Sequence, residues 1–248
     1  MKQELEQKDI AAFQEKVMSW WKKNARTLPW REDPSPYHVM ISEVMLQQTQ
    51  VNRVIPKYKQ FLEKFPTFES LASAETRHLL QVWSGLGYNR RALWLKEAAK
   101  QVVDRGEFPQ AVKELMQLKG IGPYTSRSIL IFAFNSEREL QAIADRVLLK
   151  GRSRDWHNAL MDYGSQVMTA NSTGISPTSR QACYEGSTRQ VRGAVIRALT
   201  ETDEVGLEEL MLMIGCDLKR AEMEMIIAQL VADGLVEQAP SSNYRISR

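Results

Sequence analysis

The sequence has few of the residues that bind metals or form disulfides. It contains only two cysteines, Cys183 and Cys216, and three histidines in 248 residues. The two thiols fit neither a zinc site nor a four-cysteine iron–sulfur cluster, and His38, His78 and His157 show no metal-ligand spacing. The sequence therefore predicts no metal site, no disulfide framework and a chain that works in a reducing compartment.

Long apolar runs are also missing. No stretch is long enough to span a membrane, and the start of the chain, Met-Lys-Gln-Glu-Leu-Glu-Gln-Lys, lacks the apolar core of a signal peptide. Hydrophobic residues make up 43% and charged residues 25%, which is typical of a globular protein. We expect a cytoplasmic, nucleoid-associated protein with no membrane partner.

Positive charge is unevenly distributed along the chain. The net charge is +3, but residues 191–248 hold six Lys and Arg against ten Asp and Glu and so carry −4. Residues 1–190 therefore carry +7. This excess indicates that the larger part of the chain binds nucleic acid.

Apolar residues recur at helical spacing along most of the chain, which predicts an all-α fold with no strand before the C-terminal end. Residues 171–190 are rich in Ser, Thr, Gly and Asn, as is typical of a connector. Beyond them, three helical segments precede a small hairpin at 234–246. We predict two domains, a larger one at 1–190 and a winged-helix-like one at 191–248.

A glycine hairpin lies between two helical segments, in Leu118-Lys119-Gly120-Ile121-Gly122-Pro123-Tyr124-Thr125. Two glycines separated by one apolar residue allow a tight turn that exposes backbone N–H groups at a helix start, where they can bind a phosphate. This is the helix–hairpin–helix pattern of sequence-independent DNA binders. The alternative is a plain corner between two helices with a glycine cap.

A single carboxylate stands among apolar residues in Ile41-Ser42-Glu43-Val44-Met45-Leu46. A partly buried carboxyl can have a raised pKa and act as a general acid near neutral pH. The alternative for Glu43 is a favourable charge in the first turns of a helix.

Five segments in this order resemble the MutY-type adenine glycosylases of the endonuclease III, or helix–hairpin–helix, superfamily. They are Leu28-Pro29-Trp30-Arg31, the stretch from Ser42 to Val51 that contains Leu46-Gln47-Gln48, Gly85-Leu86-Gly87-Tyr88, the glycine hairpin, and Ala159-Leu160-Met161-Asp162-Tyr163-Gly164. The resemblance covers about residues 10–165. It implies a monomeric base-excision enzyme of two helical lobes, with double-stranded DNA that carries a mismatched or damaged base as its partner.

The resemblance also implies roles for single residues. Glu43 matches the catalytic acid that protonates the adenine. Gln48 and Tyr88 match residues that wedge into the duplex when the base is extruded. The remaining matches are Trp30, Arg31, Leu46 and Asp162 in the base pocket, where relatives often have Glu for Asp162, and Gly120 and Gly122 in the phosphate-binding hairpin.

Tyr124, grouped with the DNA-binding positions, stands where bifunctional relatives carry a Schiff-base lysine. A phenol cannot form that imine, so the resemblance implies a monofunctional glycosylase.

The chain departs from the family at the cofactor. Relatives usually bind an iron–sulfur cluster after the Ala-Leu-Met-Asp helix, but residues 173–192 contain one cysteine, so we expect no cluster and no other cofactor. Arg180, Arg189 and Arg192 could hold phosphates instead, or this segment could be a solvated linker.

A second departure concerns catalysis. The family places an Asp-x-Asn segment after the hairpin, whose Asp stabilises the cationic sugar, and this chain has none. Asp145 is the nearest candidate, although the capping box at Ser136 places it in the middle of a helix on the polar face, which slightly favours a solvated helix charge. Losing such an electrostatic stabiliser typically costs on the order of a hundredfold in rate.

A third departure is the C-terminal domain. MutY proteins usually end in a domain that inspects 8-oxoguanine, whereas this chain has the acidic winged-helix-like segment, which could contact DNA, another protein or the catalytic lobes.

The leading hypothesis is therefore release of adenine mispaired with 8-oxoguanine or guanine. Alternatives are a mismatch glycosylase for uracil, thymine or hypoxanthine, a catalytically weakened mismatch-binding protein, and a transcription regulator that uses the C-terminal domain.

Overall fold

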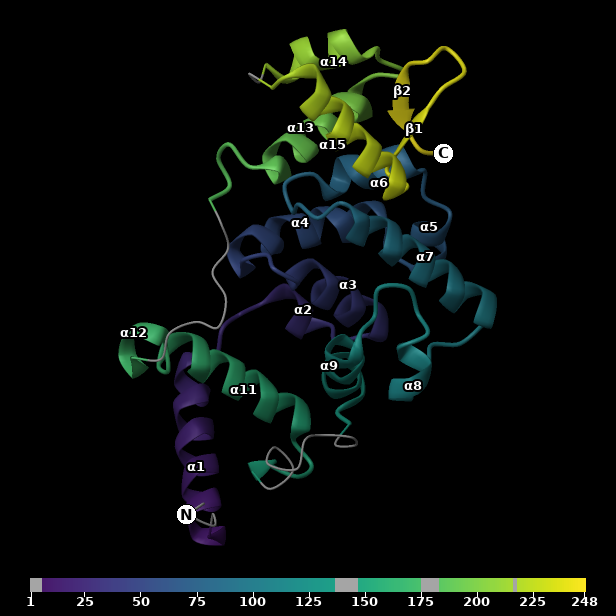
Figure 1. The fold of residues 1–248 in the computed structure, drawn as a ribbon. Helices are drawn as coiled ribbons and strands as arrows, with labels where there is room; N and C mark the ends of the chain where they lie inside the picture. The colour runs from purple at the N-terminus through teal and green to yellow at the C-terminus, as the bar shows by residue number, and fades with distance from the viewer. Residues whose placement is uncertain (1–5, 137–146, 175–182, 216–217) are drawn as a thin grey trace. The chain divides into compact units, whose positions relative to one another are not determined.

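The computed structural model of the chain describes residues 6–136, 147–174, 183–215 and 218–248 (Figure 1). Among these residues every regular element is a helix, apart from two short strands near the C-terminus. The predicted all-α class is therefore confirmed. The chain divides into two compact units, and each is described by itself. The first comprises Met1–Glu43, Gln110–Gln117 and Ile121–Arg180, and the second comprises Val44–Pro109, Leu118–Gly120 and Gln181–Arg248.

Helix α11 packs against the N-terminal helix α1 to form the core of the first unit. Val17, Met18 and Trp156 are buried together there, and the ring of Phe13 meets Trp156 edge to face at 5.7 Å. Burying such side chains is the main force that holds two amphipathic helices together. The helices of this unit are α1 (Gln7–Asn24), α2 (Pro29–Glu32), α3 (Pro36–Leu46, up to Glu43), α8 (Val112–Leu115), α9 (Pro123–Phe134), α11 (Ser153–Gln166) and α12 (Ala170–Thr173).

Aromatic and aliphatic side chains of three helices form the core of the second unit. Phe61 and Trp83 are fully buried, with ring centroids 6.1 Å apart, and Leu95 of α7 is buried as well. The elements of this unit are the end of α3, α4 (Val51–Lys64), α5 (Phe68–Ala72), α6 (Thr76–Trp83), α7 (Arg90–Arg105), α13 (Thr188–Glu201), α14 (Leu207–Ile214), α15 (Arg220–Ala232), β1 (Val236–Gln238) and β2 (Tyr244–Ile246).

The C-terminal elements of the second unit have the predicted order of three helices followed by a hairpin. Strands β1 and β2 pair antiparallel, with Val236 opposite Ile246. Helix α13 packs against α6, where Gln81 Nε2 donates to the carbonyl of Thr200 at 2.9 Å and Arg77 Nη1 donates to that of Thr202 at 2.6 Å. Residues on both sides of position 190 therefore pack together in one unit, and the domain boundary proposed there stays a prediction.

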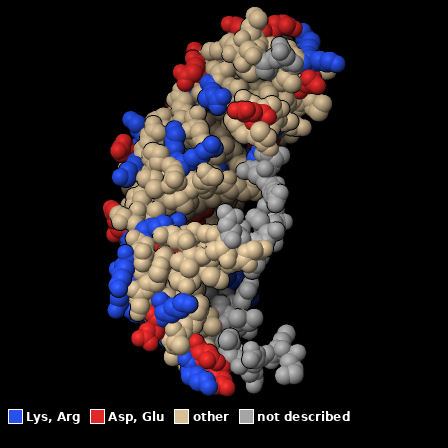
Figure 2. All heavy atoms as spheres, turned by 90° about the vertical axis from the view of Figure 1, so that its left-hand side faces the viewer, with Lys and Arg blue, Asp and Glu red and all other residues tan. Residues whose placement is uncertain are grey.

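Basic and acidic side chains are interspersed on the face drawn in Figure 2. Of the helices that the structure describes, none combines the length and the apolar character needed to cross a membrane.

Candidate active site and DNA interface

Glu43 lies on α3 in the first unit, in the last turn of a helix whose other residues are mostly buried. Its side chain is half-buried and hydrogen-bonded to the hydroxyl of Ser128, which is buried on α9. Burial raises the pKa of the Glu43 carboxyl to about 7, because desolvation disfavours the charged form more than the Ser128 hydrogen bond favours it. Near neutral pH a substantial fraction of this carboxyl is therefore protonated, as a general acid requires.

Asp162 lies on α11 and is completely buried. Its Oδ2 accepts from Trp21 Nε1 at 3.0 Å, from the backbone N–H of Arg26 at 3.0 Å and from Arg31 Nη1 at 2.8 Å. Its Oδ1 accepts from Arg26 Nε at 2.5 Å and Arg31 Nη2 at 3.0 Å. Desolvation acts to raise the pKa of Asp162, but the hydrogen bonds from Arg31 and Arg26 outweigh it and lower this pKa to about 2. Asp162 is thus an anion that holds two arginines.

Arg31 retains one unsatisfied donor in this arrangement. Its Nε is buried and has no hydrogen-bond partner among the described residues. A buried, unpaired N–H costs free energy unless a ligand or water meets it. The structure thus brings two predicted pocket residues, Arg31 and Asp162, into direct contact. Trp30 is buried beside Arg31 on α2, while Leu46 is half-buried at the end of α3 in the second unit.

The glycine hairpin has the predicted turn, and the backbone and the free space differ between its two glycines. Gly120 has φ +78°, and a Cβ there would lie 2.9 Å from Trp94 Cβ, so only glycine fits. Gly122 has φ −93°, caps α9 and leaves open space where a Cβ would point. Tyr124 follows in the first turn of α9 and is 71% exposed.

The two predicted wedge residues share an uncommon backbone conformation. Gln48 has φ +54° and Tyr88 has φ +47°, in the left-handed region that residues other than glycine rarely adopt. Both side chains are exposed, and both line the same pocket in the second unit. Such strain persists only where the surrounding structure enforces it and is common at ligand-binding positions.

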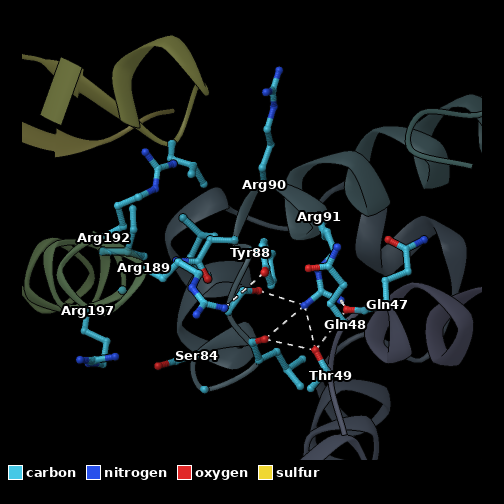
Figure 3. A pocket seen from close by; sticks show the side chains of 18 of the residues that line it. Gln47, Gln48, Thr49, Ser84, Tyr88, Arg90, Arg91, Arg189, Arg192 and Arg197 are labelled. Atoms are coloured by element: carbon cyan, nitrogen blue, oxygen red, sulfur yellow. Dashed lines mark hydrogen bonds between the residues drawn. The ribbon is translucent and has the colours of Figure 1, made fainter. Parts of the chain in front are cut away.

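Arg91 holds the two segments that contain Gln48 and Tyr88, and the sequence analysis did not single it out. Its guanidinium is buried on α7 and lies over the ring of Trp83, with Cζ 5.3 Å from the ring centroid. It donates at distances of 2.7–3.2 Å to two segments of the chain. In the first, the acceptors are Val44 O and Met45 O at the end of α3 and Gln47 O and Thr49 Oγ1 in the turn that follows, and in the second they are Leu86 O and Gly87 O. Figure 3 shows Arg91 between the two segments. Burial lowers the pKa of Arg91 to about 10, which leaves it charged at neutral pH.

A pattern in the sequence could have indicated Arg91. It continues the buried stripe of α7, which runs through Leu95, Ala98 and Val102. An arginine in an apolar stripe is unusual and points to buried acceptors that need a donor.

Two predicted positions, Asp145 and Arg180, lie outside the described residues, as does Cys216. Among the residues that the structure describes, no group of three or more His, Cys, Asp or Glu side chains could hold a metal ion. A four-thiolate cluster needs four cysteines and the sequence has two, so the residues present do not fit that cofactor.

Residues 41–232 match the model of the HhH-GPD superfamily of base excision DNA repair proteins. The chain belongs to this superfamily. The predicted family and helix–hairpin–helix fold are thereby confirmed.

Relatives within the superfamily are adenine DNA glycosylases. The one from Mycolicibacterium smegmatis is 31% identical over 281 aligned residues, which cover 93% of this chain and 94% of that protein. The rat enzyme is 42% identical over 138 residues, 51% of this chain and 27% of the rat protein. This superfamily member therefore spans nearly the whole bacterial relative but well under two thirds of the mammalian one.

Solved structures support the fold. A thermostable thymine-DNA glycosylase superposes with a TM-score of 0.60 and 24% identity, covering 65% of this chain and 88% of that one. Endonuclease III in a trapped covalent complex with DNA has a TM-score of 0.54 and 18% identity, covering 73% and 94%.

Proposed function

We propose that this chain is a monofunctional DNA glycosylase of base excision repair that removes adenine mispaired with 8-oxoguanine or guanine. The observation that carries the proposal is Glu43, a half-buried carboxyl with a pKa of about 7 inside a motif that resembles the adenine branch. The relatives named adenine DNA glycosylases support the same substrate.

Glu43 supplies the proton in the proposed reaction. Its carboxyl protonates the adenine ring, the N-glycosidic bond breaks, and the bonding electron pair leaves with the base. Water then adds to the sugar cation and loses a proton, which leaves an abasic site. Because burial holds the pKa of Glu43 near 7, the acid is substantially protonated at physiological pH. The Ser128 hydrogen bond orients the carboxyl.

The base pocket is proposed to comprise Trp30, Arg31 and Leu46. Asp162 already accepts hydrogen bonds on both oxygens, so we assign it the task of orienting Arg31 rather than touching the base. The buried Nε of Arg31 is a donor available to a ligand. The role of Asp145 as stabiliser of the sugar cation stays a prediction.

Duplex binding is proposed for the second unit and the hairpin. Gln48 and Tyr88 would fill the stack beside the extruded base, and the amides around Gly120 and Gly122 would bind a backbone phosphate. Tyr124 cannot form an imine, so no amine-driven strand cleavage follows base release. We further propose that the protein acts as a monomer on the nucleoid, without an iron–sulfur cluster.

Base release from a defined duplex tests this function. Duplexes with adenine opposite 8-oxoguanine, guanine or thymine are incubated with excess protein, and abasic sites are cut with alkali. We expect product from the first two duplexes only, and Glu43→Gln should lower the single-turnover rate by about a hundredfold or more while duplex binding is retained.

Two outcomes would redirect the proposal. Release of uracil, thymine or hypoxanthine, but not adenine, would assign a different mismatch. Mismatch-dependent binding with no abasic product from any duplex would make the chain a non-catalytic mismatch-binding protein.

A further inference from the structure

A pocket of about 630 Å³ lies within the second unit, beside the two wedge residues. The loops that carry Gln48 and Tyr88 line it together with the starts of α7 and α13. Six arginines and a single acidic residue, Asp233, are among the residues that line it. Figure 3 labels all of these arginines except Arg53. The arginines are Arg53, Arg90, Arg91, Arg189, Arg192 and Arg197.

Positive charge in this pocket is only partly compensated. Asp233 accepts from Arg90 at 3.0 Å and from Arg192 at 2.5 Å. The guanidinium groups of Arg53 and Arg197 make no hydrogen bond or ion pair with any residue that the structure describes, although the backbone of each is hydrogen-bonded. Arg91 is engaged by backbone carbonyls, which do not cancel its charge. A pocket with this excess of guanidinium groups attracts a polyanion.

Helix α13 contributes three of the arginines. Arg189, Arg192 and Arg197 all line the pocket, together with Gly193 and Ile196 of the same helix. The segment 191–248 is acidic as a whole, yet two of these arginines, Arg192 and Arg197, belong to it and line the pocket. The acidic balance of the C-terminal segment is therefore no argument against its contact with DNA.

We propose that this pocket binds the phosphodiester backbone of the strand opposite the extruded base. The inference rests on the proposed function. Glu43 and Arg31, which would receive the extruded base, belong to the first unit, whereas every residue of the arginine pocket belongs to the second. The pocket shares Gln48 and Tyr88 with the wedge, and a wedge that fills the gap left by the extruded base lies beside the nucleotide that has lost its partner, which belongs to the opposite strand.

Phosphate rather than a base edge is the target that this geometry favours. The arginines come from α4, α7 and α13 and surround the pocket, an arrangement that suits a string of phosphates rather than the edge of one base. In this way α13 would hold the opposite strand in register while the wedge residues enter the stack.

The salt dependence of duplex binding tests the pocket. The double variant Arg53→Ala/Arg197→Ala is compared with Arg105→Ala/Arg220→Ala, which removes the same charge from exposed sites outside the pocket. Both double variants also carry Glu43→Gln, so that adenine is not cleaved from the sugar during the binding measurement. Each phosphate contact contributes about 0.9 to the slope of log K against log salt, so the pocket variant should lose close to two in slope and the control much less. Equal slopes would overturn the proposal, and melting temperatures verify that both variants fold.

Neutral methylphosphonate linkages identify the strand. Placed beside the base opposite adenine, they should weaken binding of the protein with intact arginines but not of the pocket variant. Placed in the adenine strand, they should affect both alike, and the reverse pattern would overturn the assignment. If the unmodified chain releases adenine but the pocket variant keeps the slope of log K against log salt, the phosphate pocket is wrong and the proposed function still stands. Absence of adenine release by the unmodified chain would count against the proposed function instead.

Discussion

At the scale of single residues, the environment of Glu43 makes pH a direct probe of its role. Its pKa of about 7 means that the acid form is lost as pH rises, so the single-turnover rate should fall about tenfold per pH unit above 7. Rate profiles between pH 5 and 9 measure this. A rate that keeps rising through pH 8 would remove Glu43 as the acid.

The same residue also predicts an effect on stability. Because the pKa of Glu43 in the folded chain lies above the ordinary value of 4.5, its contribution to stability is fully present below pH 4.5 and is lost as pH rises through 7. Glu43→Gln removes the buried charge, so it should be more stable than the unmodified chain at pH 8, by on the order of 1–3 kcal/mol, and nearly equal at pH 4.5. Urea unfolding at the two pH values checks this.

Asp162 should behave in the opposite way. Its pKa of about 2 in the folded chain lies below the ordinary value of 3.8, so its contribution to stability is present above about pH 4 and is lost as pH falls toward 2. Asp162→Asn leaves Arg26 and Arg31 without their anion and should cost about 3–5 kcal/mol in urea unfolding at pH 7. The control Asp155→Asn, whose carboxylate forms an exposed pair with Arg152, should cost less than about 1 kcal/mol. Similar losses for both variants would contradict the buried anion.

The sequence predicts the surroundings of Glu43 better than those of Asp162. The apolar neighbours of Glu43 were enough to indicate a partly buried carboxyl. Asp162 was recognised by position, but its donors Trp21, Arg26 and Arg31 lie more than 130 residues away in the chain. Hydrogen bonds over that separation depend on how α1 and α2 meet α11, which periodicity alone does not predict.

At the scale of elements, the loops around Gln48 and Tyr88 depend on one arginine of α7. Arg91→Lys keeps the charge but cannot reach six acceptors with a single ammonium group, so both loops should lose order. We expect faster hydrogen exchange at 46–50 and 84–88 and a loss of mismatch preference. Arg105→Lys on the same helix, which forms a surface pair with Glu107, is the matched control. Unchanged exchange in the Arg91 variant would show that the loops hold their strained backbone without it.

The two hairpin glycines allow structure and function to be separated. Gly120→Ala places a methyl group 2.9 Å from Trp94 Cβ at a positive φ, so it should destabilise the chain by about 1–3 kcal/mol. Gly122→Ala meets open space at a φ of −93° and should leave the melting temperature nearly unchanged while weakening DNA binding, because a methyl group obstructs the approach of a phosphate. Equal destabilisation by the two variants would contradict the geometry of this turn.

The helices, the hairpin turn and the C-terminal helix–hairpin order could all be predicted, because periodicity and glycine spacing are local properties. The left-handed backbone at Gln48 and Tyr88 could not, since neither residue type demands it. It is imposed by Arg91, whose acceptors belong to two separate loops.

At the scale of the whole molecule, the predicted boundary at residue 190 raises the question of what the C-terminal segment does for the rest. Composition changes there, which is what a boundary normally looks like in a sequence. Within the second unit, however, Ile196 and Leu230 are buried on the same pocket that Leu80 of α6 lines, and Thr200 and Thr202 accept hydrogen bonds from α6. A change of composition therefore does not by itself separate two folding units.

Removal of residues 191–248 should consequently destabilise what remains. Leu80 is 1% exposed in the full chain and would lose its cover, as would the other apolar side chains that α13 and α15 shield. Burial of one such side chain contributes roughly 1.5–3 kcal/mol, and a domain is stable by only about 5–15 kcal/mol. We expect the 1–190 chain to melt more than about 10 °C below the full chain or to aggregate, and the milder variant Gln81→Ala to lower the melting temperature by a few degrees. A soluble 1–190 chain with an unchanged melting temperature would instead establish residues 191–248 as an independent domain, and its adenine release would show how much of the reaction needs α13.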